Sequence, residues 1–155
     1  MDIICFSHLR WNFVYQRPQH LMTRFAKQFR IYFVEEPCFQ ASADRFEIKV
    51  QDKINIVTIH LKGEPHEPEI DKRQQNILHN LMMQSKINEY ILWYYTPMAL
   101  RISEELSPVA TVFDCMDELS AFLYAPAQLK QLEKELLAKA DVVFTGGHSL
   151  YAAKK

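Results

Sequence analysis

The stretch YILWYYTPMALRISEELSPVATVF, residues 90–113, contains the pattern that decides the fold. It begins with the apolar run Tyr90–Tyr95 and ends with a second one, Ala110–Phe113. Continuous apolar runs of this length are typical of strands buried on both faces of a parallel sheet. The residues between them, Met98–Leu106, have helical spacing and stop just before Pro108. The stretch therefore predicts a strand, a short helix and a second strand parallel to the first.

The same alternation continues in both directions along the chain. Further apolar runs predict strands at Ile3–Phe6, Ile31–Val34 and Val142–Thr145. Apolar residues at helical spacing predict helices that start near Pro18, at Ile70 and at Leu129. Two nearly alternating segments, Phe46–Val50 and Ile54–Ile59, predict an antiparallel hairpin that turns at Asp52-Lys53. The pattern predicts an α/β fold with a doubly wound, Rossmann-like, mainly parallel sheet and an inserted β-hairpin.

Size and composition narrow the class of protein. The 155 residues are 48% hydrophobic and 24% charged, which indicates one globular domain, residues 1–155. The formal charge of −1 lacks the cationic excess of a general nucleic-acid-binding protein, so we expect no nucleic-acid partner. Three scattered cysteines and the absence of a signal peptide predict a cytoplasmic protein. After Thr145 a helix pattern begins and stops after two turns, so we expect a second domain to follow in a longer protein.

Glycine is scarce, with only Gly63, Gly146 and Gly147 in the chain. Both G-x-G-x-x-G and the Walker loop need several glycines close together, because backbone N–H groups must approach phosphate. The sequence therefore excludes both motifs. A nucleotide handled by this protein must be held without a glycine-rich loop of this chain, and we expect no bound cofactor.

Candidate site residues follow from the sheet, because ligands bind outside the carboxyl ends of parallel strands. The polar residues that directly follow the predicted strands are Ser7, His8, Arg10, Glu35, Glu36, Thr96, Asp114, Asp117, Glu118, Gly146, Gly147, His148 and Ser149. We expect these groups to converge on one rim of the sheet.

The acidic group Asp114, Asp117 and Glu118 is the most specific local feature. Carboxylates at a strand end can accept a hydroxyl proton, hold a sugar or ligate a metal. Alternatively Asp117 or Glu118 caps the next helix and Asp114 accepts backbone N–H bonds in the turn. A metal site is the least favoured of these interpretations, because the acidic residues are too sparse for an oxygen-ligand cage.

Other candidates are open to a functional or a structural interpretation. His8 suits a base or a hydrogen-bond donor to a ligand, or a polar residue satisfied within a tight loop, while His20 lies in the first turn of a helix that starts at the same rim. The pair Gly146-Gly147 lets a backbone approach a ligand, with the helix start at His148-Ser149 facing an anion, although a turn with positive φ explains the same glycines.

The first thirty-four residues hold five basic residues and one acidic residue, Asp2. Arginines interleaved with aromatic residues, notably Arg10, Trp11 and Arg17, suit a phosphate-bearing or glycan acceptor, or an anionic membrane surface. In the alternative, the aromatic residues belong to the core and the cations form a solvated face.

Three strings carry a family resemblance: FSHLRWNFVYQRPQHL at 6–21, FDCMDEL at 113–119 and ADVVFTGG at 140–147. They resemble the N-terminal domain of a bacterial glycosyltransferase group related to family 4, which includes teichuronic-acid-type polysaccharide enzymes. The resemblance implies the GT-B architecture, with two Rossmann-like domains facing each other across a cleft. The N-terminal domain then handles the acceptor, and the C-terminal domain holds most of the nucleotide-sugar.

The resemblance implies that the full-length enzyme transfers a sugar from a nucleotide-sugar to an acceptor hydroxyl with retention of the anomeric configuration. It also implies that this domain is inactive alone. Asp114 and Asp117 are then the catalytic candidates. Acceptor or phosphate contacts are expected from His8, Arg10 and Arg17. The expected partners are the donor, a glycan or lipid-linked acceptor, and the inner membrane face as a peripheral contact. The chain departs from many relatives in the absence of glycine from Ser7–Gln16 and in its acidic residues where they carry a histidine.

Two other classes of function remain open from the sequence. One is a non-catalytic, Rossmann-like binding or interaction domain. The other is a small hydrolase that uses Asp114 and Asp117, which predicts turnover by this chain alone.

Overall fold

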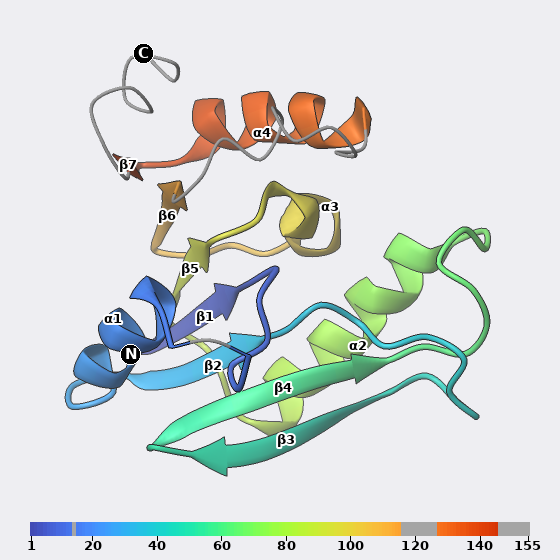
Figure 1. Ribbon diagram of the computed structural model, residues 1–155, viewed down its shortest axis with the longest axis horizontal. Coiled ribbons are helices and arrows are strands. Elements are labelled where there is room, and N and C mark those ends of the chain that lie inside the picture. Colours follow the sequence, from blue (N-terminus) through green and yellow to red (C-terminus); the bar gives the residue numbers. More distant parts are fainter. Residues whose placement is uncertain (14, 116–126, 146–155) are drawn as a thin grey trace.

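A computed structural model describes residues 1–13, 15–115 and 127–145. The strands are β1 (Asp2–Phe6), β2 (Arg30–Val34), β3 (Arg45–Gln51), β4 (Ile54–His60), β5 (Tyr90–Tyr94), β6 (Ala110–Cys115) and β7 (Val142–Thr145). The helices are α1 (Arg17–Phe25), α2 (Ile70–Gln84), α3 (Leu100–Ser103) and α4 (Ala127–Lys139), with a 3₁₀ turn, η1, at Pro97–Ala99. The seven strands form one sheet in the order β3-β4-β2-β1-β5-β6-β7 (Figure 1). All neighbouring pairs are parallel except β3 and β4, so the predicted fold class is confirmed.

Helices cover both faces of the sheet, with α1 on one face and α2, α3 and α4 on the other (Figure 1). The central strand β1 contributes side chains to the hydrophobic core on both faces of the sheet, because successive side chains of a strand point to opposite faces. Ile3 and Cys5 pack toward α1, whereas Ile4 and Phe6 pack toward the other helices, and all four are buried. This two-sided burial explains why the central strands are continuous apolar runs.

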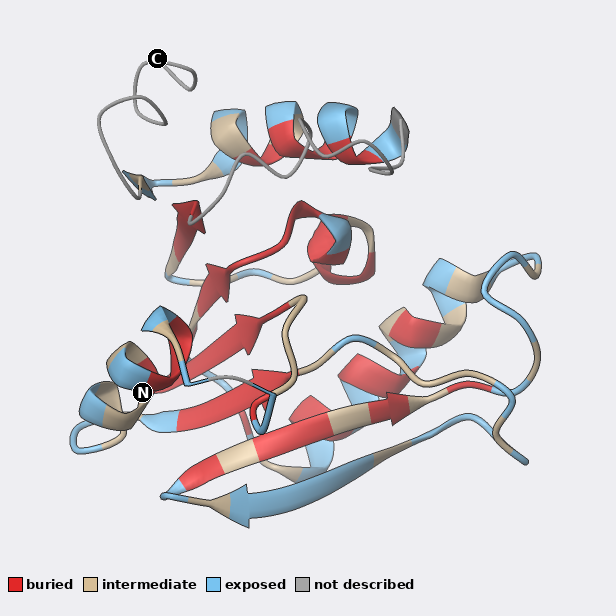
Figure 2. Cartoon of the chain, in the orientation of Figure 1, coloured by how far each residue is buried: buried red, intermediate tan, exposed pale blue. Residues whose placement is uncertain are grey.

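The predicted hairpin is present and turns at the predicted pair. Asp52 and Lys53 have φ values of 53° and 66°, and positive φ at both central residues is typical of a tight two-residue hairpin turn. Strand β4 also pairs in parallel with β2, so the hairpin extends the main sheet. Strand β3 is the outer edge and is mostly exposed (Figure 2). Its arginine, glutamate and lysine side chains suit an edge that must not pair with another chain.

The predicted helix at Met98–Leu106 is shorter in the structure. Thr96 accepts a hydrogen bond from the Met98 backbone N–H, which starts the 3₁₀ turn, and α3 ends at Ser103. The Ser103 hydroxyl donates back to the Ala99 carbonyl at 2.8 Å, and it also meets the Tyr94 hydroxyl at 2.6 Å. A serine that bonds backward in this way does not favour a longer helix.

Several predicted site residues fall in segments that the structure leaves out of its description. These are Asp117, Glu118, Gly146, Gly147, His148 and Ser149. Within the described residues, none of the helices has the length and apolar character needed to cross a bilayer.

Candidate functional site

The carboxyl ends of β1, β2 and β5 meet at one rim, and the loop after β1 is anchored there. The Trp11 backbone N–H donates to Glu35 Oε2 at 2.6 Å, directly beyond the end of β2. The Gln19 side chain, on α1, donates to the Trp11 carbonyl at 2.9 Å. The loop is therefore held by one side chain that follows β2 and one of α1, without the glycines that a phosphate-binding loop would need.

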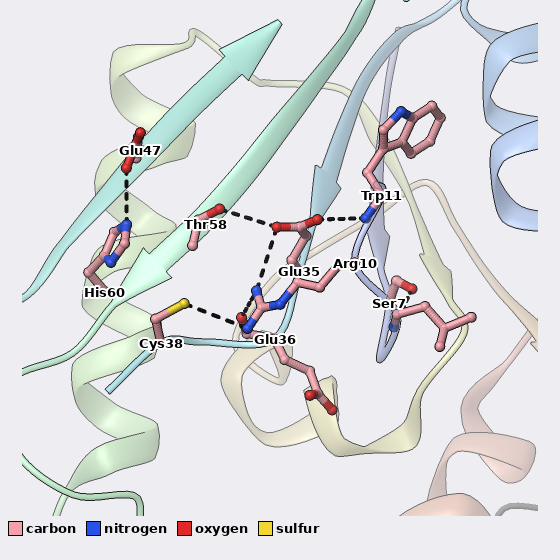
Figure 3. Close-up of polar contacts among 10 residues, drawn as sticks. Ser7, Arg10, Trp11, Glu35, Glu36, Cys38, Glu47, Thr58 and His60 are labelled. Carbon is pink, nitrogen blue, oxygen red and sulfur yellow. Dashed lines mark hydrogen bonds and ion pairs between the residues drawn. The ribbon is translucent and has the colours of Figure 1, made fainter. Parts of the chain in front are cut away.

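Arg10 is the cation of this loop, and it lies among three partners from the segment after β2 (Figure 3). Its guanidinium is 3.5 Å from Glu35 Oε1 and also donates to the Glu36 carbonyl and the Cys38 sulfur. Thr58, on β4, donates to the same Glu35 oxygen at 3.3 Å. The charge of Arg10 is thus matched by Glu35, and the side chain serves first to fix the loop.

A pocket of about 60 Å³ opens at this rim, between the strand ends and helices α2 and α3. Its polar lining comprises Ser7, Glu35, Glu36, Gln74 and Thr96. Its apolar lining comprises Phe6, Val34, Pro37, Ile59, Met98, Ala99 and Ile102. The predicted convergence of polar residues from the ends of β1, β2 and β5 is therefore observed in this pocket.

A second group of polar residues lies on the α1 face of the sheet. Asp114 follows Val112 by two residues on β6, so its side chain turns toward α1. Arg17 is the first residue of α1, and its Nε donates to Asp114 Oδ2 at 2.9 Å. The start of α1 is fixed by a capping box between Gln16 and Gln19. Asp114 is fully buried, whereas the Arg17 side chain is 43% exposed.

The Asp114 carboxylate has an incomplete set of partners. Its Oδ1, the Trp93 indole N–H and the Tyr95 hydroxyl are buried close to one another, and none of them makes a hydrogen bond of ordinary geometry to a described residue. Burial raises the pKa of Asp114, and the nearby Tyr95 hydroxyl and the Arg17 guanidinium act in the opposite direction. Burial likewise raises the pKa of the Tyr95 hydroxyl above its ordinary range, and the Asp114 charge adds to this. Buried unsatisfied groups are rare, and a cluster of them beside a charged pair marks a candidate functional position.

Three other predicted residues have different surroundings. The Trp11 indole is 3% exposed and packs edge-on against Phe33 at 5.0 Å, so its ring belongs to the core as the structural alternative had it. His20 is exposed on α1, with its ring 4.5 Å from that of Tyr15. His8 lies half-buried in the loop after β1. Nothing in the structure tests whether Trp11, His20 or His8 contacts a substrate, so these contacts stay predictions.

Sequence reasoning missed Trp93, Tyr95 and Gln74. The two aromatic residues were interpreted only as part of a buried strand, although their two-residue spacing already put them on one face. Gln74 lies in the polar half of the α2 pattern, and nothing in a single sequence indicates that its amide reaches the rim. Within the described part of the chain there is no group of three or more His, Cys, Asp and Glu side chains suited to hold a metal ion.

Comparisons with known proteins bear on the fold. No family model matches this sequence, and neither does any curated protein. A solved structure described as trehalose-6-phosphate from E. coli bound with UDP-2-fluoro glucose matches over 99% of this chain, with a TM-score of 0.63 and 9% identity. An alpha,alpha-trehalose-phosphate synthase (UDP-forming) from Burkholderia xenovorans in complex with glucose-6-phosphate matches over 92%, with a TM-score of 0.52 and 9% identity.

These similarities establish an architecture. The Rossmann-like sheet is that of the N-terminal half of a GT-B fold, as the sequence resemblance implied. This chain spans 42% and 40% of the two matched proteins, and identities of 9% show the fold alone. The narrower resemblance to the teichuronic-acid-type group of family 4 stays a prediction.

Proposed function

We propose that this chain is the acceptor-side, N-terminal domain of a retaining GT-B glycosyltransferase in polysaccharide or glycan biosynthesis. The observation that carries the proposal is the likeness of 99% of the chain to a GT-B protein bound to a nucleotide-sugar analogue. Supporting it, polar side chains gather at the carboxyl ends of the strands, where α/β sheets bind ligands. The donor would be held mainly by a second domain, which accords with the absence of a glycine-rich loop here.

Within this proposal Arg17 contacts the acceptor, and Asp114 holds the Arg17 side chain in position. Arg17 is the half-exposed partner of the pair, so its guanidinium can reach a hydroxyl or phosphate oxygen at the rim. Asp114 has no exposed surface, which argues against the direct contact that the sequence suggested for it. A buried carboxylate that fixes a guanidinium still affects catalysis, because misplacement of a contact group by 1 Å can lower the rate by about 100-fold. Asp117 stays the candidate for direct contact with the transferred sugar.

The proposal is tested by screening the full-length protein against nucleotide-sugars for binding and for hydrolysis. We expect one class of nucleotide-sugar to bind and to be slowly hydrolysed, and Asp117→Asn to reduce turnover without lowering the melting temperature. Residues 1–155 expressed alone should give no turnover. Turnover by residues 1–155 alone would support a hydrolase instead, and a full-length protein that binds no nucleotide-sugar would contradict the transferase.

A lipid-linked acceptor would bring this domain to the inner face of a membrane, and we propose that contact as well. Phe13 and Tyr15 are 70% and 56% exposed in the loop that leads to α1, the helix that carries the basic residues Arg17 and Arg24. Exposed aromatic residues next to cations favour an anionic lipid surface. Co-sedimentation with vesicles containing phosphatidylglycerol should decrease in Phe13→Ser and not in Val50→Ser, which removes an equally exposed apolar residue from β3. Equal binding by both variants would contradict this contact.

A further inference from the structure

The pocket at the rim contains a side chain whose hydrogen-bonding groups are unused. Gln74, on α2, is only 8% exposed and lines the pocket, yet its amide makes no hydrogen bond to any residue that the structure describes. Its neighbour Gln75 donates instead to the Arg101 carbonyl at 2.9 Å. Neither of its amide atoms is fully shielded from solvent, so both are open to hydrogen bonds with a ligand in the pocket.

Two hydroxyl groups of the same pocket also have a proton left to donate. Ser7 accepts a hydrogen bond from the Leu9 backbone N–H at 3.0 Å, and Thr96 accepts one from Met98 at 3.2 Å. Among the described residues neither hydroxyl donates a hydrogen bond of its own. The pocket therefore offers donors to a carbonyl oxygen, from Ser7, Thr96 or the Gln74 amide. It offers the Gln74 carbonyl as an uncharged acceptor for an N–H group, besides the carboxylates of Glu35 and Glu36.

Volume and charge restrict what can enter. A cavity volume of about 60 Å³ is room for about four water-sized groups, at roughly 15 Å³ for each. That is too small for a hexose ring and close to the size of one ring substituent. Glu35 and Glu36 line the pocket and the charge of Arg10 is matched by Glu35, so a carboxylate or phosphate would be repelled. The apolar wall, with Val34, Ile59 and Ile102, favours a substituent with a methyl end.

We propose that this pocket binds the acetamido substituent of an N-acetylhexosamine, which we identify as part of the acceptor. The acetamido group has four non-hydrogen atoms, a carbonyl for the unused donors, an N–H for the Gln74 carbonyl and a methyl for the apolar wall. The identification as acceptor rests on the proposed function, whereas binding of the substituent does not. The inferred acceptor thus differs in chemistry from the glucose-6-phosphate held by the Burkholderia xenovorans protein.

The test measures binding of four methyl glycosides to the full-length protein by saturation-transfer NMR. The four compounds are the methyl glycosides of N-acetylglucosamine, glucose, glucosamine and glucuronic acid. We expect the N-acetylglucosamine derivative to bind most tightly, with the strongest saturation at its acetamido methyl. Gln74→Met should weaken that binding by about tenfold, which is one unsatisfied hydrogen-bonding group converted to a ratio of dissociation constants. The matched control Gln75→Met removes a hydrogen bond outside the pocket and should bind as the wild type does.

The wild-type comparison among the four sugars does not depend on whether a variant folds. Tighter binding of glucose, glucosamine or glucuronic acid, or unchanged binding in a folded Gln74→Met protein, would overturn the inference. A protein that turns over a nucleotide-sugar without preferring the acetamido sugar refutes this inference alone. A protein that prefers the acetamido sugar but binds and turns over no nucleotide-sugar supports the pocket and refutes the transferase.

Discussion

Two arginine–carboxylate pairs in this molecule differ in almost every respect. Arg73 and Asp44, which join α2 to the loop before β3, form two hydrogen bonds of 2.6 and 2.7 Å. Asp44 also accepts the Lys62 backbone N–H at 2.8 Å, so both of its oxygens are satisfied. Arg17 and Asp114 are joined by one hydrogen bond of 2.9 Å, and the second oxygen of Asp114 is buried without a partner among the described residues.

The pKa values of the two carboxyls move in opposite directions. Hydrogen bonds from Arg73 are the main reason that the pKa of Asp44 falls to about 2. Burial is the main reason that the pKa of Asp114 rises. The satisfied pair has the properties of a structural clamp, whereas the unsatisfied pair lies at the carboxyl ends of the strands, where we propose a functional position.

The largest expected effect is on activity. In the full-length enzyme Asp114→Leu should lower kcat/KM for sugar transfer by about 100-fold, because the Arg17 guanidinium loses its anchor. Asp114→Asn, which keeps one oxygen for Arg17, should recover part of the loss, and acceptor KM should change more than donor KM. Asp44→Asn should leave both parameters unchanged. Equal effects of Asp114→Leu and Asp44→Asn on kcat/KM would remove the functional distinction between the pairs.

A smaller effect is expected on stability when the arginine is removed. Arg17→Met leaves a buried charge without its counter-ion, which should lower the free energy of unfolding at pH 7 by about 2 kcal/mol. The half-exposed guanidinium keeps this loss below that of a fully buried pair. The loss should be smaller at pH 4 than at pH 7, because the raised pKa of Asp114 favours the neutral carboxyl as the pH falls. Urea denaturation at the two pH values checks this, and a pH-independent loss would contradict it.

Adjacent tyrosines provide an internal control for the unsatisfied cluster. Tyr94→Phe removes a buried hydroxyl bonded to Ser103 and should lower the free energy of unfolding by about 1 kcal/mol. Tyr95→Phe removes a buried hydroxyl that lies near Asp114 and Trp93 without a hydrogen bond of ordinary geometry to the described residues, and should cause a smaller loss. Thermal and urea unfolding of both variants give the comparison. A loss in Tyr95→Phe as large as that in Tyr94→Phe would mean that the Tyr95 hydroxyl is hydrogen-bonded in solution.

The carboxyls of Asp114 and Asp44 should contribute to the pH dependence of the free energy of unfolding with opposite signs. The folded protein binds more protons at Asp114 than the unfolded chain does, so this group lowers stability as pH rises above about 4. Asp44 binds fewer, so its stabilisation is present above about pH 4 and is lost as pH falls toward 2. Asp114→Asn should reduce the decline on the neutral side and Asp44→Asn the decline on the acid side. Unfolding free energies between pH 2.5 and 7 test both signs.

Local patterns were sufficient to predict most of the fold. The apolar runs identified the segments that become strands, because a strand buried on both faces has apolar residues at successive positions and not an apolar–polar alternation. Asp52-Lys53 was identifiable as a turn between alternating segments, and the structure places both residues at positive φ. The helix after β5 was predicted too long because its end depends on Ser103 and Tyr94, which lie nine residues apart and meet only in the folded chain.

Only part of the candidate site could be predicted from local sequence patterns. The rule that ligands bind at strand ends brought Ser7, Glu35 and Thr96 to one rim, and the structure places all three in one pocket. The rule assigns no face to a residue, however, and Asp114 lies on the opposite side of the sheet from that pocket, with Arg17 of α1. Gln74 reaches the pocket because α2 packs beside the strand ends, a contact between distant segments that no local pattern encodes.

The sequence by itself determined the α/β class, the strand and helix segments, the hairpin and the rim on which polar groups gather. These depend on apolar periodicity and turn chemistry, which act over a few residues. Only the tertiary structure decided that Arg10 is neutralised by Glu35, that Trp11 is a core residue, and that Asp114 is buried with one oxygen unsatisfied. Those properties depend on burial and on partners distant in the chain, because the free energy of a charge is set by what surrounds it in space.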